Sequence, residues 1–146
     1  MSDPVTNPIN GRCLCGSVRF SVTGPVSGIV ICHCSMCRRA AGGAYGAFFV
    51  ARRAAVTWTG ETYLTSYESS PGLIRSFCTR CGGAATGANL TTPDDTIILA
   101  ANMLDAEAAL PVIAVEYADD KAPWTEHEKS APQFKGAFPG WSDLKP

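Results

Sequence analysis

The sequence predicts a mainly β protein. Short runs rich in apolar and β-branched residues recur at short, regular spacing, and several of them are bounded by glycine, proline or aspartate. Strands spaced in this way, with little sequence left for long helices, are typical of an all-β fold. The chain has 146 residues, which is the size of a single domain able to bury a core.

The expected domain covers residues 11–146, and the polar, proline-containing residues 1–10 are expected to form a flexible arm. The first strand is predicted where Val18, Phe20 and Val22 alternate with polar residues, the period of a half-buried strand. The next strands, expected from their apolar runs, are Ile29–Ile31, Ala47–Ala51 and Val56–Trp58.

The middle of the chain predicts an antiparallel hairpin. Tyr63–Tyr67 and Leu73–Phe77 are the expected strands, and a strong turn signal, Ser-Ser-Pro-Gly at residues 69–72, lies between them. We expect this hairpin to bring Cys78 and Cys81 to the N-terminal part of the domain.

The C-terminal part predicts two more strands and a tail. Thr96–Met103 is the expected buried strand, Val112–Tyr117 the expected last strand, and Asp105–Leu110 between them an expected helical turn. From about residue 119 the sequence is rich in prolines and charges. We expect an ordered tail there, held to the domain by its aromatic side chains Trp124, Phe134, Phe138 and Trp141.

Three of the seven cysteines lie in the stretch Cys-His-Cys-Ser-Met-Cys at residues 32–37. Thiolates this close repel one another, so the spacing favours a bound cation. A disulfide would leave one sulfur unpaired, whereas zinc can bind all three and keep a fourth position for water or substrate. An extended segment points Cys32 and Cys34 to one side, and a helical turn from Ser35 would return Cys37 to Cys34.

The other four cysteines favour a second, closed zinc site. Cys13 and Cys15 form a C-x-C pair, and Cys78 and Cys81 form a C-x-x-C pair. Together these pairs supply the four sulfurs of a structural zinc site. A glycine follows each pair, where a tight turn often needs a positive φ angle. The spacing leaves one alternative open, because exchanging the two C-x-C pairs between the sites gives the same count.

Other interpretations of the cysteines are weaker. An odd number of cysteines argues against a disulfide framework, and three clustered motifs argue against unliganded core thiols. No C-x-x-C motif lies at the strand-to-helix junction of a βαβ pattern, so a thioredoxin-like redox motif is not favoured. The expected cofactor is therefore zinc, with two ions per chain.

Two arginines follow the three-cysteine stretch directly. Arg38 and Arg39 are candidates for binding a substrate carboxylate, which guanidinium groups hold with paired hydrogen bonds. His33 lies between two expected ligands, but strand alternation points it away from them. This favours either a bond to a backbone carbonyl or a role in orienting the ligands without binding the metal. Tyr45 and Phe48 follow closely, and they either line a pocket or pack in the core.

Charge and hydropathy exclude several functions. Twelve lysines and arginines against thirteen aspartates and glutamates give a net charge of -1, without the basic excess of a nucleic-acid-binding domain. No apolar run approaches the roughly 18 residues of a membrane span. The first ten residues lack the basic and apolar regions of a signal peptide. Many unpaired thiols without an export signal predict a cytoplasmic protein.

With these motifs the chain resembles the glutathione-dependent formaldehyde-activating family, which includes the centromere protein V group. The specific parts are Gly-Arg-Cys-Leu-Cys-Gly-Ser-Val at residues 11–18, Cys-His-Cys-Ser-Met-Cys-Arg-Arg at 32–39, and Phe-Cys-Thr-Arg-Cys-Gly at 77–82. Lys-Ala-Pro-Trp at 121–124 and Pro-Gln-Phe at 132–134 also look like the family's C-terminal end. The chain departs from the pattern just before the tail, where many members carry a histidine followed by an apolar residue.

The resemblance implies a β-tent fold, which contains several coiled antiparallel β-sheets and two zinc sites. It places structural zinc on the first and third motifs, at Cys13, Cys15, Cys78 and Cys81. It places the zinc where chemistry is expected on the second motif, at Cys32, Cys34 and Cys37.

From the residues and the resemblance we expect a zinc-dependent enzyme of the carbon–sulfur lyase class. The expected substrate is a small thiol such as glutathione, or a thiol–aldehyde adduct such as S-hydroxymethylglutathione. Zinc would lower the pKa of the bound thiol, so that a thiolate adds to, or leaves from, an aldehyde carbon. The alternatives are a non-catalytic zinc-stabilised binding module and a scavenger of thiols or aldehydes. The oligomeric state stays open.

Overall fold

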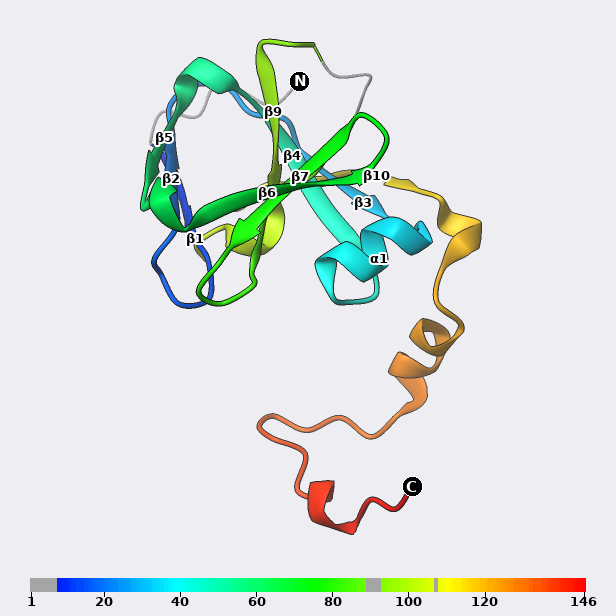
Figure 1. The fold of residues 1–146 in the computed structure, drawn as a ribbon. Helices are drawn as coiled ribbons and strands as arrows, with labels where there is room; N and C mark the ends of the chain where they lie inside the picture. The colour runs from blue at the N-terminus through cyan, green and yellow to red at the C-terminus, as the bar shows by residue number, and fades with distance from the viewer. Residues whose placement is uncertain (1–7, 89–92, 107) are drawn as a thin grey trace.

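The computed structural model describes residues 8–88, 93–106 and 108–146, and within them the chain is mainly β, as predicted (Figure 1). Ten strands in these ranges form two sheets. The α-helix α1 covers Ser35–Ala41, and the remaining helical segments of the described residues are 3-10 turns. None of the described helices has the length and apolar character needed to span a membrane.

The smaller sheet contains β1 (Ile9–Arg12), β2 (Arg19–Val22) and β5 (Val56–Thr59), paired antiparallel in the order β1-β2-β5. The alternation in β2 is as predicted, because Phe20 and Val22 are buried. Strand β1 begins at Ile9, inside the range expected to be a flexible arm. The rest of that arm, residues 1–7, lies outside the described residues.

The larger sheet has seven strands in the order β10-β3-β4-β9-β8-β7-β6. Its pairs are antiparallel except one, because β10 lies parallel to β3, whereas the resemblance implied antiparallel sheets. The predicted hairpin is confirmed as β6 and β7. In chain order the seven strands of the larger sheet are β3 (Ile29–Cys32), β4 (Gly46–Arg52), β6 (Leu64–Ser70), β7 (Leu73–Cys78), β8 (Ala84–Thr86), β9 (Thr96–Ala100) and β10 (Val112–Glu116).

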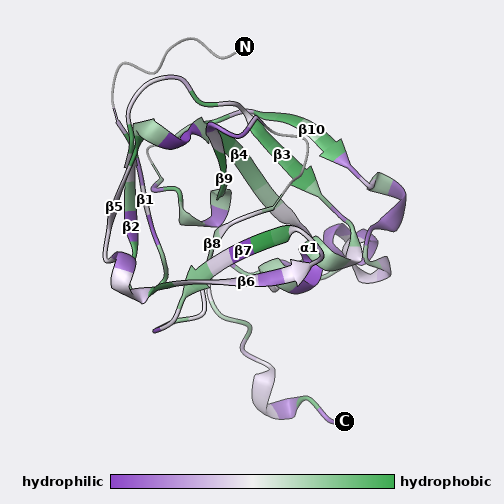
Figure 2. Cartoon of the chain, turned by 45° about the horizontal axis from the view of Figure 1, so that its top comes forward, coloured by the Kyte–Doolittle hydropathy of each residue, from purple (hydrophilic) through white to green (hydrophobic). Residues whose placement is uncertain are grey.

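The hydrophobic core lies between the two sheets. Phe20 of the smaller sheet packs its ring 6.2 Å from that of Phe49 in β4, and 6.0 Å from the ring of Trp58. Leu99 of β9 is fully buried in the same cluster. Strands β3 and β4 are among the most hydrophobic parts of the chain in Figure 2. Cys78 at the end of β7 belongs to this core, and β3, which ends at Cys32, pairs with β4 beside it.

Two expected elements near the C-terminus differ from the structure. The strand expected over Thr96–Met103 ends at Ala100, and the next three residues form a 3-10 turn in which Met103 is buried. The helical turn expected over Asp105–Leu110 is reduced to a single hydrogen-bonded turn, in which the N–H of Ala108 donates to the carbonyl of Asp105 at 3.0 Å. Residue 107 lies outside the described residues. The last strand is confirmed as β10.

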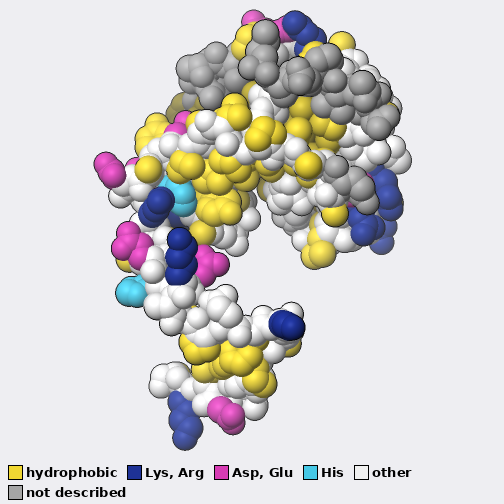
Figure 3. Space-filling view, turned by 180° about the vertical axis from the view of Figure 1, so that it is seen from behind, with side chains coloured by type: hydrophobic (Ala, Val, Ile, Leu, Met, Phe, Trp, Pro, Cys, Tyr) yellow, Lys and Arg dark blue, Asp and Glu magenta, His cyan; other side chains and the backbone are white. Residues whose placement is uncertain are grey.

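The tail leaves the domain instead of packing against it (Figures 1 and 3). Ala122 is buried at its start, but Trp124 and Trp141 are 61% and 71% exposed. The ring of Phe138 lies 5.5 Å from that of Phe134 and 6.0 Å from that of Trp141, so these aromatic residues contact one another. The expectation that they hold the tail to the domain is wrong.

Candidate metal centres

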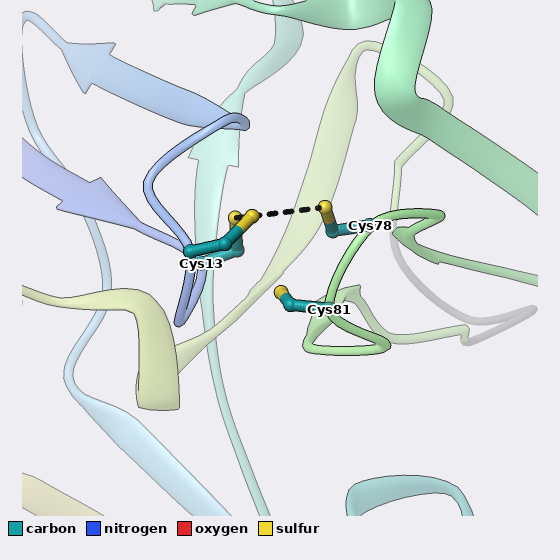
Figure 4. A group of neighbouring side chains, drawn as sticks. Cys13, Cys78 and Cys81 are labelled. Atoms are coloured by element: carbon teal, nitrogen blue, oxygen red, sulfur yellow. Dashed lines mark hydrogen bonds between the residues drawn. The ribbon is translucent and has the colours of Figure 1, made fainter.

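Four cysteines gather where the smaller sheet meets the end of β7. Figure 4 shows Cys13 from the β1–β2 loop, Cys78 at the end of β7 and Cys81 from the following turn. With Cys15, they form a group whose four Sγ atoms lie within 4.8 Å of one another. The Sγ of Cys15 lies 3.7 Å from that of Cys13 and 3.8 Å from that of Cys78.

These distances suit a metal ion. Metal–sulfur bonds of about 2.3 Å in a tetrahedron separate the sulfurs by about 3.8 Å, whereas a disulfide joins them at about 2.05 Å. We name these four residues, Cys13, Cys15, Cys78 and Cys81, the four-cysteine cluster. The exchange of C-x-C pairs that the sequence left open is thereby resolved, because the N-terminal pair faces the C-x-x-C pair.

Tight turns position both pairs of the four-cysteine cluster. The N–H of Gly16 donates to the carbonyl of Cys13 at 3.1 Å, and the N–H of Gly82 donates to the carbonyl of Cys78 at 2.8 Å. Both glycines have positive φ angles, 77° and 76°, which a residue with a Cβ adopts only at a cost. The N–H of Val18 donates to the Sγ of Cys13 at 3.3 Å, so the turn also directs a backbone donor at a sulfur.

The pKa values in the four-cysteine cluster differ between sulfurs. Hydrogen bonds from the side chain and the backbone of Ser17 lower the pKa of Cys15 to about 6. A backbone hydrogen bond from Cys15 lowers the pKa of Cys81, whereas burial raises the pKa of Cys78 to about 11. A cation is the group that would stabilise all the thiolates together.

The other three cysteines form a second group around the start of α1. We name Cys32, Cys34 and Cys37 the three-cysteine cluster, and their Sγ atoms also lie within 4.8 Å of one another. Cys32 ends β3, and Cys34 caps α1 by accepting the N–H of Cys37 at 3.3 Å. The predicted helical turn from Ser35 is confirmed. Among the described residues, no histidine, aspartate or glutamate joins this group.

Burial dominates the electrostatics of the three-cysteine cluster. Cys32 and Cys37 are buried, and burial raises the pKa of both thiols. For Cys34, burial acts in the same direction, but hydrogen bonds from the backbone of Cys37 and from the neighbouring thiols outweigh it and lower the pKa. Three thiolates in so buried a place need positive charge beside them.

Arg75 of β7 supplies part of that charge, and the sequence did not single it out. Its Nη2 lies 3.7 Å from the Sγ of Cys37, and its Nε donates to the Oγ of Ser69 at 3.1 Å. The guanidinium is buried, with 6% of the residue exposed. The sequence could have indicated this residue, because strand alternation places Arg75 on the same side as the apolar Leu73 and Phe77. A charged residue on the apolar side of a strand is a candidate for a buried functional group.

The two candidate arginines on α1 face different places. Arg38 donates its Nε to the carbonyl oxygen of His33 at 3.0 Å, and it lines an open hollow of about 440 Å³ that also includes Cys34 and Lys121. Arg39 lines a separate cavity of about 280 Å³ together with Arg75. The structure therefore does not bring Arg38 and Arg39 into one clamp.

His33 is buried and lies outside the sulfur group. Its ring meets that of Tyr45 edge-on at 5.4 Å. Its Nδ1 is buried without a hydrogen-bond partner among the described residues, so the carbonyl bond expected for this side chain is not formed there. Of the two aromatic residues considered for a pocket, Phe48 lines the cavity of Arg39 and Arg75, and Tyr45 is 44% exposed.

Known proteins resemble this chain in fold and in sequence. A crystal structure of a Rhodobacter sphaeroides protein matches at a TM-score of 0.55 and 25% identity, over 73% of this chain and 98% of that one. A Halomonas elongata protein named "Putative glutathione-dependent formaldehyde-activating enzyme" is 36% identical over an alignment of 84 residues, which covers 52% of this chain. The matched stretch spans 53%, about half, of that relative's length.

A family model described as "Glutathione-dependent formaldehyde-activating enzyme" matches residues 8–120. This range holds both cysteine clusters and all ten strands of the described residues. The predicted resemblance is thereby confirmed: the chain belongs to the glutathione-dependent formaldehyde-activating enzyme family.

Proposed function

We propose that this protein is a zinc-dependent enzyme of the carbon–sulfur lyase class, and that the three-cysteine cluster is its reactive centre. One observation carries the proposal. Three sulfurs lie close enough to share an ion, and no fourth protein donor joins them among the described residues. A tetrahedral zinc site with three protein ligands keeps one position for water or substrate, whereas a four-ligand site is closed.

Glutathione and formaldehyde are the substrates that family membership supports. In the proposed reaction the thiol sulfur adds to the aldehyde carbon and forms the carbon–sulfur bond. The electron pair of the carbonyl π bond moves to oxygen, and the proton released by the thiol ends on that oxygen. The product is a hydroxymethyl thioether, and the reverse reaction breaks the same bond and restores both reactants.

Distinct residues would serve metal binding and substrate binding. The three-cysteine cluster, Cys32, Cys34 and Cys37, would hold zinc. When bound, zinc would lower the pKa of a substrate thiol toward neutral pH. Arg39 would bind a substrate carboxylate, since it is exposed and lines the neighbouring cavity. The four-cysteine cluster would hold a second, structural zinc ion. All seven cysteines are unpaired, which supports a reducing, cytoplasmic environment.

The test is the formation of S-hydroxymethylglutathione from glutathione and formaldehyde. The protein is purified without oxygen, its zinc content is measured, and the adduct is followed by NMR against the uncatalysed rate. We expect acceleration by wild type and loss of it in Cys37→Ser. The matched control is Met36→Leu, which changes an exposed neighbour on the same helix and keeps every sulfur ligand.

The outcomes separate the alternatives. If wild type holds two zinc ions and accelerates neither direction of the reaction, the enzymatic proposal is wrong. Stoichiometric glutathione binding without turnover would then indicate a scavenger. No thiol binding at all would indicate a zinc-stabilised binding module.

A further inference from the structure

Strand β10 is an edge strand that is exposed along its whole length. It lies at one end of the strand order of the larger sheet, beside β3, and no described strand pairs with its other edge. Figure 2 shows β10 as one of the hydrophobic strands. Ile113, Val115 and Tyr117, which follows the strand directly, are 60%, 48% and 59% exposed. An edge of this kind offers unpaired backbone groups to another chain.

Most of the features that normally protect an edge strand are absent from β10. Its sequence, Val-Ile-Ala-Val-Glu, contains no proline and no lysine, and its single charge is on the last residue. The register against β3 shifts between Val112 and Ala114, so residues 114–116 pair regularly. The chain that follows turns toward the start of α1, where Asp120 and Lys121 line a hollow, and β10 stays exposed.

The backbone groups of Val115 are directed at the open edge. The carbonyl of Glu116 accepts the N–H of His33 at 3.1 Å, so the peptide groups of Glu116 face β3. Successive residues of a strand present their peptide groups to opposite sides, so the N–H and the carbonyl of Val115 face away from β3. In an antiparallel pair, two residues directly opposite each other exchange both bonds. Val115 is therefore suited to pair with Val115 of a second copy across a two-fold axis.

The side chains also suit this self-pairing. With Val115 at the axis, Ile113 of one copy lies opposite Tyr117 of the other, and such aliphatic–aromatic pairs stabilise adjacent strands. Glu116 lies opposite Ala114, so the two carboxylates do not face each other. The surface that β10 and Tyr117 expose in two copies is on the order of 1,000 Å² in total, which is the lower limit for a specific interface.

We propose that β10 is a dimerisation edge, through which two copies of this chain pair antiparallel and join their larger sheets. The contact uses the same edge of both copies, so it closes as a two-fold dimer and leads to no further growth. Its small area predicts a reversible dimer. The proposal is independent of the proposed function, because it rests on strand pairing and not on the chemistry of the metal centres.

The experiment measures the mass of zinc-loaded protein by analytical ultracentrifugation over a dilution series. We expect a reversible dimer for wild type, and dimerisation at least about tenfold weaker for Val115→Lys and for Val115→Glu, because like charges would meet at the axis. A mixture of the two variants should dimerise again, because opposite charges then meet. The matched control is Ile74→Lys, which changes an exposed residue of β7, away from this edge, and should keep the dimer.

A wild type that stays monomeric throughout the series overturns the proposal. So does a dimer that survives in Val115→Lys, and its loss on removal of residues 131–146 would place the interface on the tail instead. If both variants are folded monomers and their mixture stays monomeric, residue 115 does not meet its own copy and the proposed pairing is wrong.

A measurement on wild type decides the question if the variants fail to fold. Hydrogen exchange of the N–H of Val115 should slow as the protein concentration rises, because only the dimer bonds this group. Exchange at Val115 that does not depend on concentration would overturn the proposal.

Discussion

The two cysteine clusters differ in how much of the chain they join. The four-cysteine cluster connects Cys15 with Cys78, 63 positions apart, and so ties the smaller sheet to the end of β7. The three-cysteine cluster takes its sulfurs from one segment, residues 32–37, around the start of α1. Metal at the first cluster would cross-link the fold, whereas metal at the second would close almost no chain.

The surroundings of the two clusters differ as well. The four-cysteine cluster has an exposed member, Cys15. The three-cysteine cluster has two buried members, a buried arginine in contact with one of them and a cavity lined by that arginine. The comparison teaches that the two clusters differ in the number of sulfurs and in the length of chain they join, and the proposal of one structural and one reactive centre rests on these two differences.

The largest expected effect is on stability. Cys78→Ser should leave the protein unfolded or insoluble, because metal at a four-sulfur site contributes on the order of 10 kcal/mol, comparable to the stability of a whole domain. Cys37→Ser should fold, keep about one zinc ion per chain and lose thiol binding. Thermal melts, zinc content and thiol binding on both variants check this. If Cys37→Ser melts as early as Cys78→Ser, the distinction between the clusters is wrong.

Stepwise removal of metal should separate the clusters in the wild-type protein. We expect a chelator to remove zinc first from the three-cysteine cluster, because that site has fewer protein ligands. Thiol binding should disappear with the first ion, and the melting temperature should fall steeply only with the second. The measurement is zinc release, followed by a colorimetric dye, beside a melt at each stage. Loss of stability at the first step would contradict the comparison.

Two glycines test the clusters more gently. A Cβ on Gly46 would lie 2.6 Å from the ring of Phe48 and 3.2 Å from the Cβ of Cys37, so Gly46→Ala should cost about 1–3 kcal/mol and weaken thiol binding. Gly16→Ala meets no atom closer than the flexible end of the Arg19 side chain, at 3.0 Å, but keeps a positive φ angle, at a cost of about 1–2 kcal/mol. We expect Gly16→Ala to leave thiol binding unchanged. Chemical denaturation and calorimetry on both variants check this, and equal loss of thiol binding would refute it.

The smallest effect is expected from the end of the tail. Residues 131–146 are exposed except for a partly exposed Gly140, and their aromatic contacts are with one another. Removing these residues should change the free energy of unfolding by no more than about 0.5 kcal/mol. Zinc content and thiol binding should stay at wild-type levels. A large drop in any of the three would mean that this part of the tail supports one of the clusters.

The sequence predicted correctly those elements that depend on residues close to one another in the chain. The hairpin of β6 and β7 followed from a turn signal, and the helical turn that begins α1 followed from the i, i+3 spacing of Cys34 and Cys37. Strand β8 was missed because it has three residues, two of them alanines, which have low β propensity. The tail was misplaced because aromatic residues pack equally well against one another and against a domain.

The site was predicted only as far as local spacing reaches. The spacing within each cysteine pair can be seen in the sequence. Which pairs come together in one cluster depends on which strands lie side by side in the fold. Arg75 lies 38 positions from Cys37, so nothing in the order of residues linked them before β7 was placed in the sheet. Arg38 and Arg39 are adjacent in sequence, yet the helix directs them to different cavities.

The parallel pairing of β10 with β3 has a consequence for biosynthesis. Cys32 lies opposite Glu116, and the N–H of His33 donates to the carbonyl of Glu116 at 3.1 Å. On the ribosome, the roughly eighty residues between Cys37 and Glu116 take about 4–16 s to synthesise at 5–20 residues per second. Throughout that interval β3 lacks its parallel partner β10, although β4 on its other side has already been made. The order of translation therefore allows the three-cysteine cluster to meet a metal ion while its edge of the sheet is still open.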